Sequence, residues 1–337
     1  MAITDKNALT PSFEAVESWL SGRWEHFFGA RFPRDNDDFF SLGGHSLMAI
    51  RLITKVHEEF ATELSIADIV KHRTRSTLAR LIMNRMGDAS TQVPQSIPEA
   101  DRSNPLPLSP TQEYLLFESL LNADQPIYNE VATLHLGDDV DMRPLEQAFN
   151  AFISRHEAFR MAFEWESGEL NQEVYPVGPV TLPIEDFRGY PADDRENHAG
   201  HFASKWSSQP FDLKKPPLIR AFVGLYSQSD TRLHVVAHHL AIDAYTLFDI
   251  LPKELWALYR AFRHNQPIDL PALRIQYPDI AAWRKKQALS NAPEALAYWK
   301  RKLSGYQPFE LPGDCPNMGE TNAAGAIKVF QLDNELT

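Results

Sequence analysis

Residues 38–47 read DFFSLGGHSL, and the first part of the chain is organised around them. Gly43 and Gly44 permit a tight backbone turn that a Cβ atom would obstruct. Ser46 follows the turn, where a helical pattern begins. The apolar residues of this pattern recur at helical spacing and form one predicted stripe: Leu47, Ile50, Ile53, Val56 and Phe60. The stretch therefore predicts a loop that leads into a serine at the start of an amphipathic helix.

A serine at this position has two interpretations. The free N–H groups and the positive dipole end of a helix start favour an anion, which suits a phosphodiester on the Ser46 hydroxyl. Alternatively, the Ser46 side chain simply caps the helix. The glycines and the serine alone leave both interpretations open.

The flanking residues predict a small helical bundle. Three apolar residues at helical spacing mark a first helix: Phe13, Val16 and Leu20. Ser65 is a predicted N-cap of a short helix, and a last helix is expected over about residues 76–86. We therefore expect an all-α, four-helix domain over residues 10–87.

The composition changes after this bundle. Residues 88–104 are rich in Pro, Ser, Gln and Asp with few apolar anchors, which predicts a linker. Helical and strand-like segments then alternate, which predicts a layered α/β domain. The helical segments are 112–121 and 145–156, and the strand-like segments are 131–136, 218–225 and 233–237.

Two adjacent histidines follow the last of these predicted strands. His238 and His239 are followed four residues later by Asp243. A neutral imidazole relays protons near neutral pH, and a carboxylate orients a loop through hydrogen bonds. Buried structural histidines or a pair of metal ligands would give the same pattern. These residues alone therefore leave catalysis, structure and metal binding open.

Composition excludes several classes of function. The net charge of −12 argues against nucleic-acid binding, which needs clustered basic residues. A single cysteine, Cys315, allows no internal disulfide and fits a reducing compartment, and no Cys-x-x-Cys spacing predicts a metal site. No apolar run is long enough for a membrane span, and the first residues lack signal-peptide features. We therefore expect a cytoplasmic protein without a metal.

The wider string from Asp38 to Leu47 resembles the attachment motif of peptidyl carrier domains. The resemblance implies that a phosphopantetheinyl transferase places 4′-phosphopantetheine on Ser46. It also implies that the arm carries an aminoacyl or peptidyl thioester, which an adenylation domain loads. In this family a histidine rather than an aspartate before the serine, here His45, is more usual where no epimerase follows, which points to an L-configured donor.

Residues 105–314 resemble condensation domains of nonribosomal peptide synthetases, which belong to the chloramphenicol-acetyltransferase-like superfamily. The HHxxxD motif at 238–243 matches the family signature. Four further matches follow the family order: SPTQ at 109–112, RHEAFR at 155–160, YPDIAAW at 277–283 and LPGD at 311–314. The resemblance implies a two-lobed α/β fold, with a first lobe over residues 105–285. Residues 286–337 would be the crossover and the start of an incomplete second lobe.

This resemblance also implies roles for individual residues. His239 is expected to contact the acceptor amine as a base or a hydrogen-bond partner, with His238 beside it. Asp243 is expected to orient the loop by pairing with Arg160. Gln112 and Arg155 are expected to hold the lobe together, and three aromatic residues are expected in the core: Phe163, Tyr277 and Trp283.

The implied activity is amide formation between a donor on this carrier and an acceptor on a downstream carrier domain. Such synthetases make secondary metabolites of the antibiotic or siderophore type. Because most of the second lobe is missing, the chain alone is expected to be inactive. Position 244 is alanine where the family has glycine, which would strain the backbone if φ were positive. This departure motivates one alternative, a noncatalytic docking platform. The other alternative is an ester-forming or coenzyme-A-dependent acyltransferase of the same superfamily.

Overall fold

The computed structural model describes residues 11–29, 37–86, 97–166 and 169–307. The chain divides into two compact units, Met1–Ser96 and Ile97–Thr337, and each is described by itself. Cys315, the LPGD motif at 311–314 and the end of the chain lie outside the described residues.

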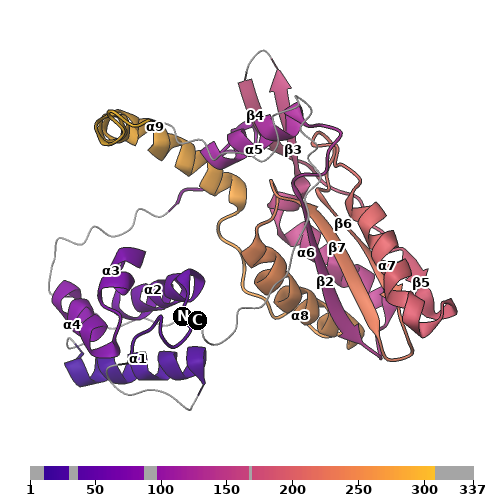
Figure 1. Ribbon diagram of the computed structural model, residues 1–337, viewed down its shortest axis with the longest axis horizontal. Helices are drawn as coiled ribbons and strands as arrows, with labels where there is room; N and C mark the ends of the chain where they lie inside the picture. Colours follow the sequence, from indigo (N-terminus) through magenta and orange to yellow (C-terminus); the bar gives the residue numbers. More distant parts are fainter. Residues whose placement is uncertain (1–10, 30–36, 87–96, 167–168, 308–337) are drawn as a thin grey trace. The chain divides into compact units, whose positions relative to one another are not determined.

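The described part of the first unit consists of four helices (Figure 1). They are α1 (Phe13–Phe28), α2 (Ser46–Phe60), α3 (Ile66–Lys71) and α4 (Arg75–Met86). Their shared core contains Leu20, Trp24, Leu52 and Ile82, all at most 1% exposed. Ser65 forms a capping box with Asp68 at the start of α3, as predicted for this N-cap. The predicted four-helix bundle is confirmed.

The buried stripe of α2 differs from the predicted one. Ala49, Leu52 and Val56 are fully buried, whereas Ile50 is 46% exposed. Ile50 lies four residues after the exposed Ser46 and therefore on the same helical face. The predicted stripe was therefore wrong at Ile50. Apolar residues lie on two faces of this helix, and the face centred on Leu52 is the one that packs against the other helices of the bundle.

The second unit contains two sheets. The smaller is antiparallel, with strand order β1-β4-β3, and the larger has the order β2-β7-β6-β5. Within the larger sheet β2, β7 and β6 are antiparallel, while β5 runs parallel to β6. The strands are β1 (Leu106–Pro107), β2 (Asn129–Gly137), β3 (Met161–Glu166), β4 (Glu169–Val174), β5 (Ile184–Asp186), β6 (Ile219–Leu225) and β7 (Thr231–His238).

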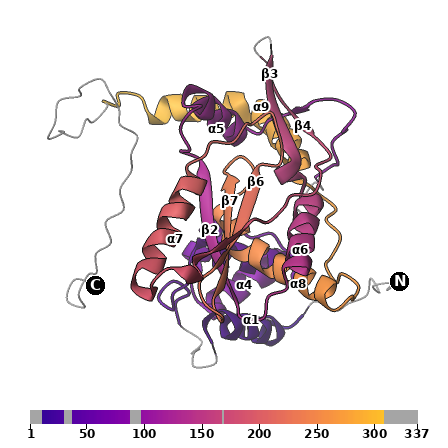
Figure 2. The ribbon, with the colours of Figure 1, turned by 90° about the vertical axis from the view of Figure 1, so that its right-hand side faces the viewer.

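Helices cover both faces of the larger sheet, which confirms the predicted α/β class (Figure 2). The α-helices are α5 (Pro110–Leu121), α6 (Met142–Arg155), α7 (Ala192–Ser207), α8 (Leu251–Arg263) and α9 (Tyr277–Lys302). Three short helical turns accompany them: η1 (Glu157–Arg160), η2 (Phe187–Gly189) and η3 (Thr246–Ile250). Successive side chains of β6 point to opposite faces of the sheet and so contribute to two different cores. Ala221 and Val223 belong to the core that includes residues of α6 and α8, whereas Phe222 belongs to the core that includes residues of α7.

β7 carries the tandem histidines to their position. It pairs with β2 on one side and β6 on the other, and Leu233 to Ala237 are all buried, including His234. A strand with neighbours on both sides and helices on both faces reads as a continuous apolar run. The strand ends at His238, so His239 is the first residue of the loop that follows.

Residues 97–104 were predicted to belong to the linker, but they are part of the second unit and contact its other elements. The Ala100 N–H donates to Asp279 Oδ1 over 2.7 Å, and the Arg102 guanidinium pairs with Asp279 and with Glu157. Asp279 is only 2% exposed, so its charge is compensated where it is buried. Through these contacts the segment 97–104 connects the start of α9 to η1.

Among the residues that the structure describes, none of the helices has the length and apolar content needed to cross a membrane.

Candidate functional site

Ser46 is the first residue of α2, and its side chain is exposed. His45 precedes it as the N-cap residue in an extended conformation and makes no side-chain capping hydrogen bond. The first-turn N–H groups of α2 are therefore not capped by a side chain, and they favour a negative group at this position.

The loop that presents Ser46 depends on a close backbone approach at Gly44. A Cβ atom at this position would lie 2.4 Å from the Phe39 carbonyl oxygen. The Gly44 N–H donates to that same oxygen over 2.9 Å, and the Phe39 ring is fully buried in the bundle. Phe39 thus anchors the loop to the core, while Ser46 stays accessible. These residues fit a phosphodiester-linked arm on the Ser46 hydroxyl.

His238 is buried between aromatic rings and is only 6% exposed. Its Nδ1 atom accepts a hydrogen bond from the Leu240 N–H over 3.2 Å. Burial, together with the neighbouring His239, lowers the pKa of His238 to about 4. His238 is therefore a neutral structural histidine that shapes the turn.

His239 lies in the loop and has an open edge. Its backbone N–H donates to the Tyr128 carbonyl oxygen over 2.9 Å, which extends the β2–β7 pairing by one residue. Its Nδ1 atom lies 2.9 Å from the Ile242 carbonyl oxygen and 3.5 Å from Glu130 Oε1. Since a carbonyl oxygen can only accept, Nδ1 carries the proton and Nε2 carries a lone pair in the neutral ring. No described residue hydrogen-bonds to Nε2.

Asp243 closes the same loop. Its Oδ1 atom accepts a hydrogen bond from the Thr246 N–H over 2.7 Å, in the manner of a helix cap ahead of η3. The predicted pair with Arg160 is wrong for the described residues. The Arg160 guanidinium instead donates to the carbonyl oxygens of Tyr175 and Ser154, because η1 ends at Arg160 and directs it to these backbone groups.

Ala244 causes no backbone strain in this loop. The non-glycine residues with positive φ among the described ones are Ala61 and Asn265, and Ala244 lies in a helical turn. Alanine in place of the family glycine therefore does not have to adopt a left-handed backbone conformation, and the expected strain is absent.

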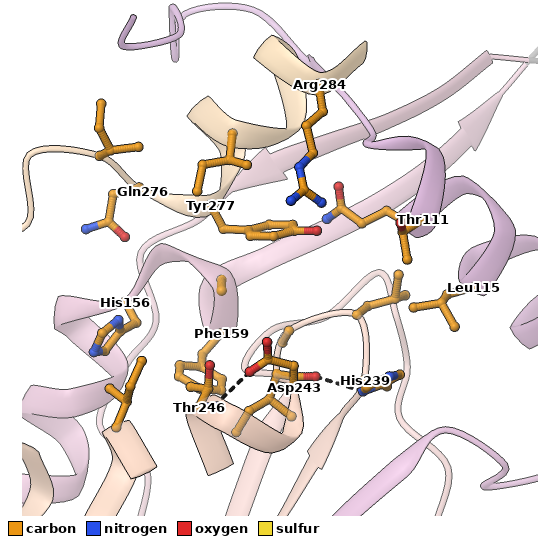
Figure 3. Close-up of a pocket in the computed structure, with 18 of the residues that line it drawn as sticks. Thr111, Leu115, His156, Phe159, His239, Asp243, Thr246, Gln276, Tyr277 and Arg284 are labelled. Atoms are coloured by element: carbon orange, nitrogen blue, oxygen red, sulfur yellow. Dashed lines mark hydrogen bonds between the residues drawn. The ribbon is translucent and has the colours of Figure 1, made fainter. Parts of the chain in front are cut away.

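A cavity of about 520 Å³ opens beside His239. Figure 3 shows Thr111, His156, Tyr277 and Arg284 around it, with His239 and Asp243 at its lower edge. A volume in this range suits a small-molecule substrate. Tyr277 was predicted to be a core residue but lines this cavity and meets Ser109 Oγ over 3.3 Å. Arg284 was not singled out, since an arginine after an aromatic motif carries no signal by itself.

The supporting residues hold the walls of the cavity together. The Arg155 Nε–H donates to Glu254 Oε2 over 3.0 Å, which ties α6 to α8, and His156 meets the same carboxylate at 2.7 Å. Burial lowers the pKa of His156, against the opposing effect of Glu254. Gln112 forms a capping box with Ser109 and donates to Gln172 Oε1 over 2.9 Å. Gln112 and Arg155 thus each connect two elements of the unit, and their supporting role for the site stays a prediction.

Phe163 is fully buried, as expected for a core residue, whereas Trp283 is half-buried. Within the described ranges, no group of three or more His, Cys, Asp or Glu side chains could hold a metal ion.

Comparison with known proteins gives two family matches. The family described as "Condensation domain" matches residues 102–337, and "Phosphopantetheine attachment site" matches residues 19–82. One of the linear gramicidin synthase proteins of Brevibacillus parabrevis is 34% identical over 323 residues, which is 95% of this chain but 6% of that relative. Malpinin synthetase of Mortierella alpina is 31% identical over 324 residues, which is 96% of this chain and 4% of that relative. The chain thus spans a small part of the curated relatives that it matches.

Two solved structures share the fold of the second unit. The first condensation domain of the calcium-dependent antibiotic synthetase has a TM-score of 0.54 and 18% identity, with 61% of this chain and 49% of that chain covered. A chain of the complex of the X-domain and OxyB from teicoplanin biosynthesis has a TM-score of 0.57 and 21% identity, with 66% of this chain and 48% of that chain covered.

Proposed function

Because the chain belongs to the condensation-domain family of nonribosomal peptide synthetases and carries a phosphopantetheine-attachment domain ahead of the condensation domain, we propose that it presents an aminoacyl or peptidyl donor on Ser46 for amide formation. The proposed setting is a larger cytoplasmic synthetase. The observation that carries the proposal is the geometry of His239, a residue that lines a substrate-sized cavity and whose Nδ1–H donates to the Ile242 carbonyl, which leaves Nε2 as the acceptor of the neutral ring.

Ser46 is the proposed attachment residue. When bound, phosphopantetheine supplies a terminal thiol that carries an acyl group as a thioester. Ser46 contributes an exposed hydroxyl, and the uncapped first turn of α2 favours the negative charge of the linkage. Gly44 and Phe39 keep this loop in place.

His239 is the proposed residue that contacts the acceptor amine. An Nε2 lone pair accepts a hydrogen bond from the amine N–H and so orients the nitrogen toward the acyl carbon. Because a neutral amine is already nucleophilic, we assign more of this role to positioning than to proton removal. His238 and Asp243 hold the loop from either side, through the hydrogen bonds with Leu240 and Thr246.

The proposed partners follow from this role. A phosphopantetheinyl transferase modifies Ser46, an adenylation domain loads the arm, and a downstream carrier domain delivers the acceptor. The net charge of −12 gives no reason to propose nucleic acid among them.

One experiment separates this function from a docking platform. In a synthetase that contains this chain, the His239→Ala variant should load the carrier normally but form far less peptide product. Unchanged product formation with His239→Ala would favour the platform. Offering matched amine and alcohol acceptors tests the ester-forming alternative, since preference for the alcohol would support it.

A further inference from the structure

The polar groups that line the cavity beside His239 differ in whether they have partners. His156 is paired with Glu254, and His239 is paired with the Ile242 carbonyl and approaches Glu130. Asp243 accepts from the Thr246 N–H. Each of these side chains is therefore already held by the protein.

Arg284 is different. It lines the cavity from α9 and is exposed, and no described residue forms a hydrogen bond, ion pair or ring contact with it. The next residue, Lys285, is ion-paired with Glu113 of α5. In Figure 3 the Arg284 side chain descends from α9 toward the Tyr277 ring, from the side of the cavity opposite His239 and Asp243. The cavity thus has a cationic wall whose charge has no described counterion.

The backbone beneath Arg284 is fixed. Asp279 caps the start of α9 and binds the Ala100 N–H, Ala281 is fully buried, and Lys285 ties the next position to α5. An arginine on an anchored helix turn is a pre-organised donor, and its planar guanidinium suits a carboxylate in bidentate geometry.

The other end of the cavity has the opposite character. The Asp243 carboxylate and the Nε2 lone pair of His239 are hydrogen-bond acceptors and suit an amine. An amino acid with a side-chain carboxylate would therefore match both ends, with its amine at His239 and its carboxylate at Arg284. Apolar residues such as Leu115 and Ile280 lie along the cavity with them.

We infer that Arg284 is a specificity-determining residue, and that the cavity selects an aminoacyl group with an acidic side chain. This inference rests on the proposed function, because it assumes that the cavity holds an aminoacyl substrate. The phosphate of the arm is the other anion of similar chemistry. It is linked to the end of the arm far from the thioester, whereas Arg284 lines the same cavity as the proposed reaction centre.

The test is binding to the full chain, measured by titration calorimetry. The probes are glutamyl and glutaminyl amides of aminopantetheine, in which a stable amide replaces the thioester. They differ only in side-chain charge. A third probe, pantetheine phosphate without an aminoacyl group, reports on the arm. The variants are Arg284→Gln and, as a matched control, Lys286→Gln, which removes the same charge from an exposed position of α9 outside the cavity lining.

The glutamyl probe should bind about tenfold tighter than the glutaminyl probe, the difference expected for a charge-assisted hydrogen bond. Arg284→Gln should reduce this preference to less than about twofold, whereas Lys286→Gln should keep it, and salt should weaken it. Arg284→Glu should instead favour an ornithyl probe. Thermal unfolding of each variant verifies that the fold is retained.

Two results would overturn the inference and leave the proposed function intact. One is equal binding of both aminoacyl probes, or a preference that survives Arg284→Gln. The other is an Arg284-dependent affinity for the phosphate probe without any preference between the aminoacyl probes. If no aminoacyl probe binds to the parent chain, the proposed function is contradicted and the inference fails with it.

Discussion

The Nδ1 atom of His239 lies 2.9 Å from the carbonyl oxygen of Ile242, three residues later in the same loop. This contact fixes the tautomer, because the carbonyl can only accept, and it leaves Nε2 as the acceptor of a residue that lines the cavity. His238 has the opposite arrangement, since its Nδ1 atom accepts from the Leu240 N–H. The two adjacent histidines thus differ in which ring nitrogen carries the proton, because Nδ1 of His239 meets a backbone carbonyl and Nδ1 of His238 meets a backbone N–H.

Replacing His239 by alanine should reduce the rate of amide formation about 100-fold, the size of effect expected when a reacting group loses its positioning. The measurement is single-turnover peptide formation in a synthetase that contains this chain. The matched control is His135→Ala, whose side chain is 68% exposed on β2 and does not line the cavity. Equal losses in the two variants would contradict the assignment.

Asp243 should act through the loop. Replacing it by alanine removes the cap on the Thr246 N–H and should cost about 1 kcal/mol of stability. Asp243→Asn retains an acceptor oxygen and should keep most of both stability and activity. Urea unfolding and single-turnover rates check this pair. A severe loss in Asp243→Asn would show that the negative charge itself is needed.

The second unit should lose stability on acidification from pH 7 to pH 5. Burial is the largest cause that lowers the pKa of both His234 and His238 to about 4. Since an unfolded histidine titrates near 6.5, the unfolded chain binds more protons between these values, and stability falls as the pH falls. The expected loss is about 2 kcal/mol per histidine at pH 5.

Denaturant midpoints at the two pH values measure this loss. In the His238→Asn variant the amide oxygen can still accept from the Leu240 N–H. The loss of stability between pH 7 and pH 5 should then be smaller by the contribution of one histidine, about 2 kcal/mol. A midpoint that does not change with pH, or an unaltered pH dependence in the variant, would refute buried neutral histidines.

Gly44→Ala should destabilise the first unit by about 1–3 kcal/mol, because the added Cβ would meet the Phe39 backbone and ring. Gly22→Ala is the matched control. It lies inside α1 with nothing within 4 Å of the added atom, and it should stabilise the helix by about 0.5–1 kcal/mol. Thermal unfolding distinguishes them, and similar effects of the two changes would contradict the close approach at Gly44.

Local patterns predicted much of this architecture. Ser46 at the start of a helix, the Ser65 cap and the strand that ends at His238 all follow from neighbouring residues. Each depends on spacing along one element, which the sequence contains directly. Family resemblance then selected His239 from several possible roles for a histidine pair.

Contacts between distant elements were beyond these patterns. The partner of Arg160 depends on how η1 ends beside Tyr175, and the exposure of Ile50 depends on which face of α2 packs against the bundle. Arg284 lines the cavity because α9 packs beside α5, a contact between elements that are distant in the sequence. Tertiary packing, rather than local preference, settles such cases.

The central claim is that Ser46 offers its hydroxyl for a thiol arm that serves the site at His239. The most direct test is the intact mass of the chain after incubation with coenzyme A and a promiscuous phosphopantetheinyl transferase. We expect the mass to rise by one phosphopantetheine in the parent chain and in His239→Ala, and not in Ser46→Ala. An unmodified parent chain, or a Ser46→Ala variant that gains the same mass, would contradict the account.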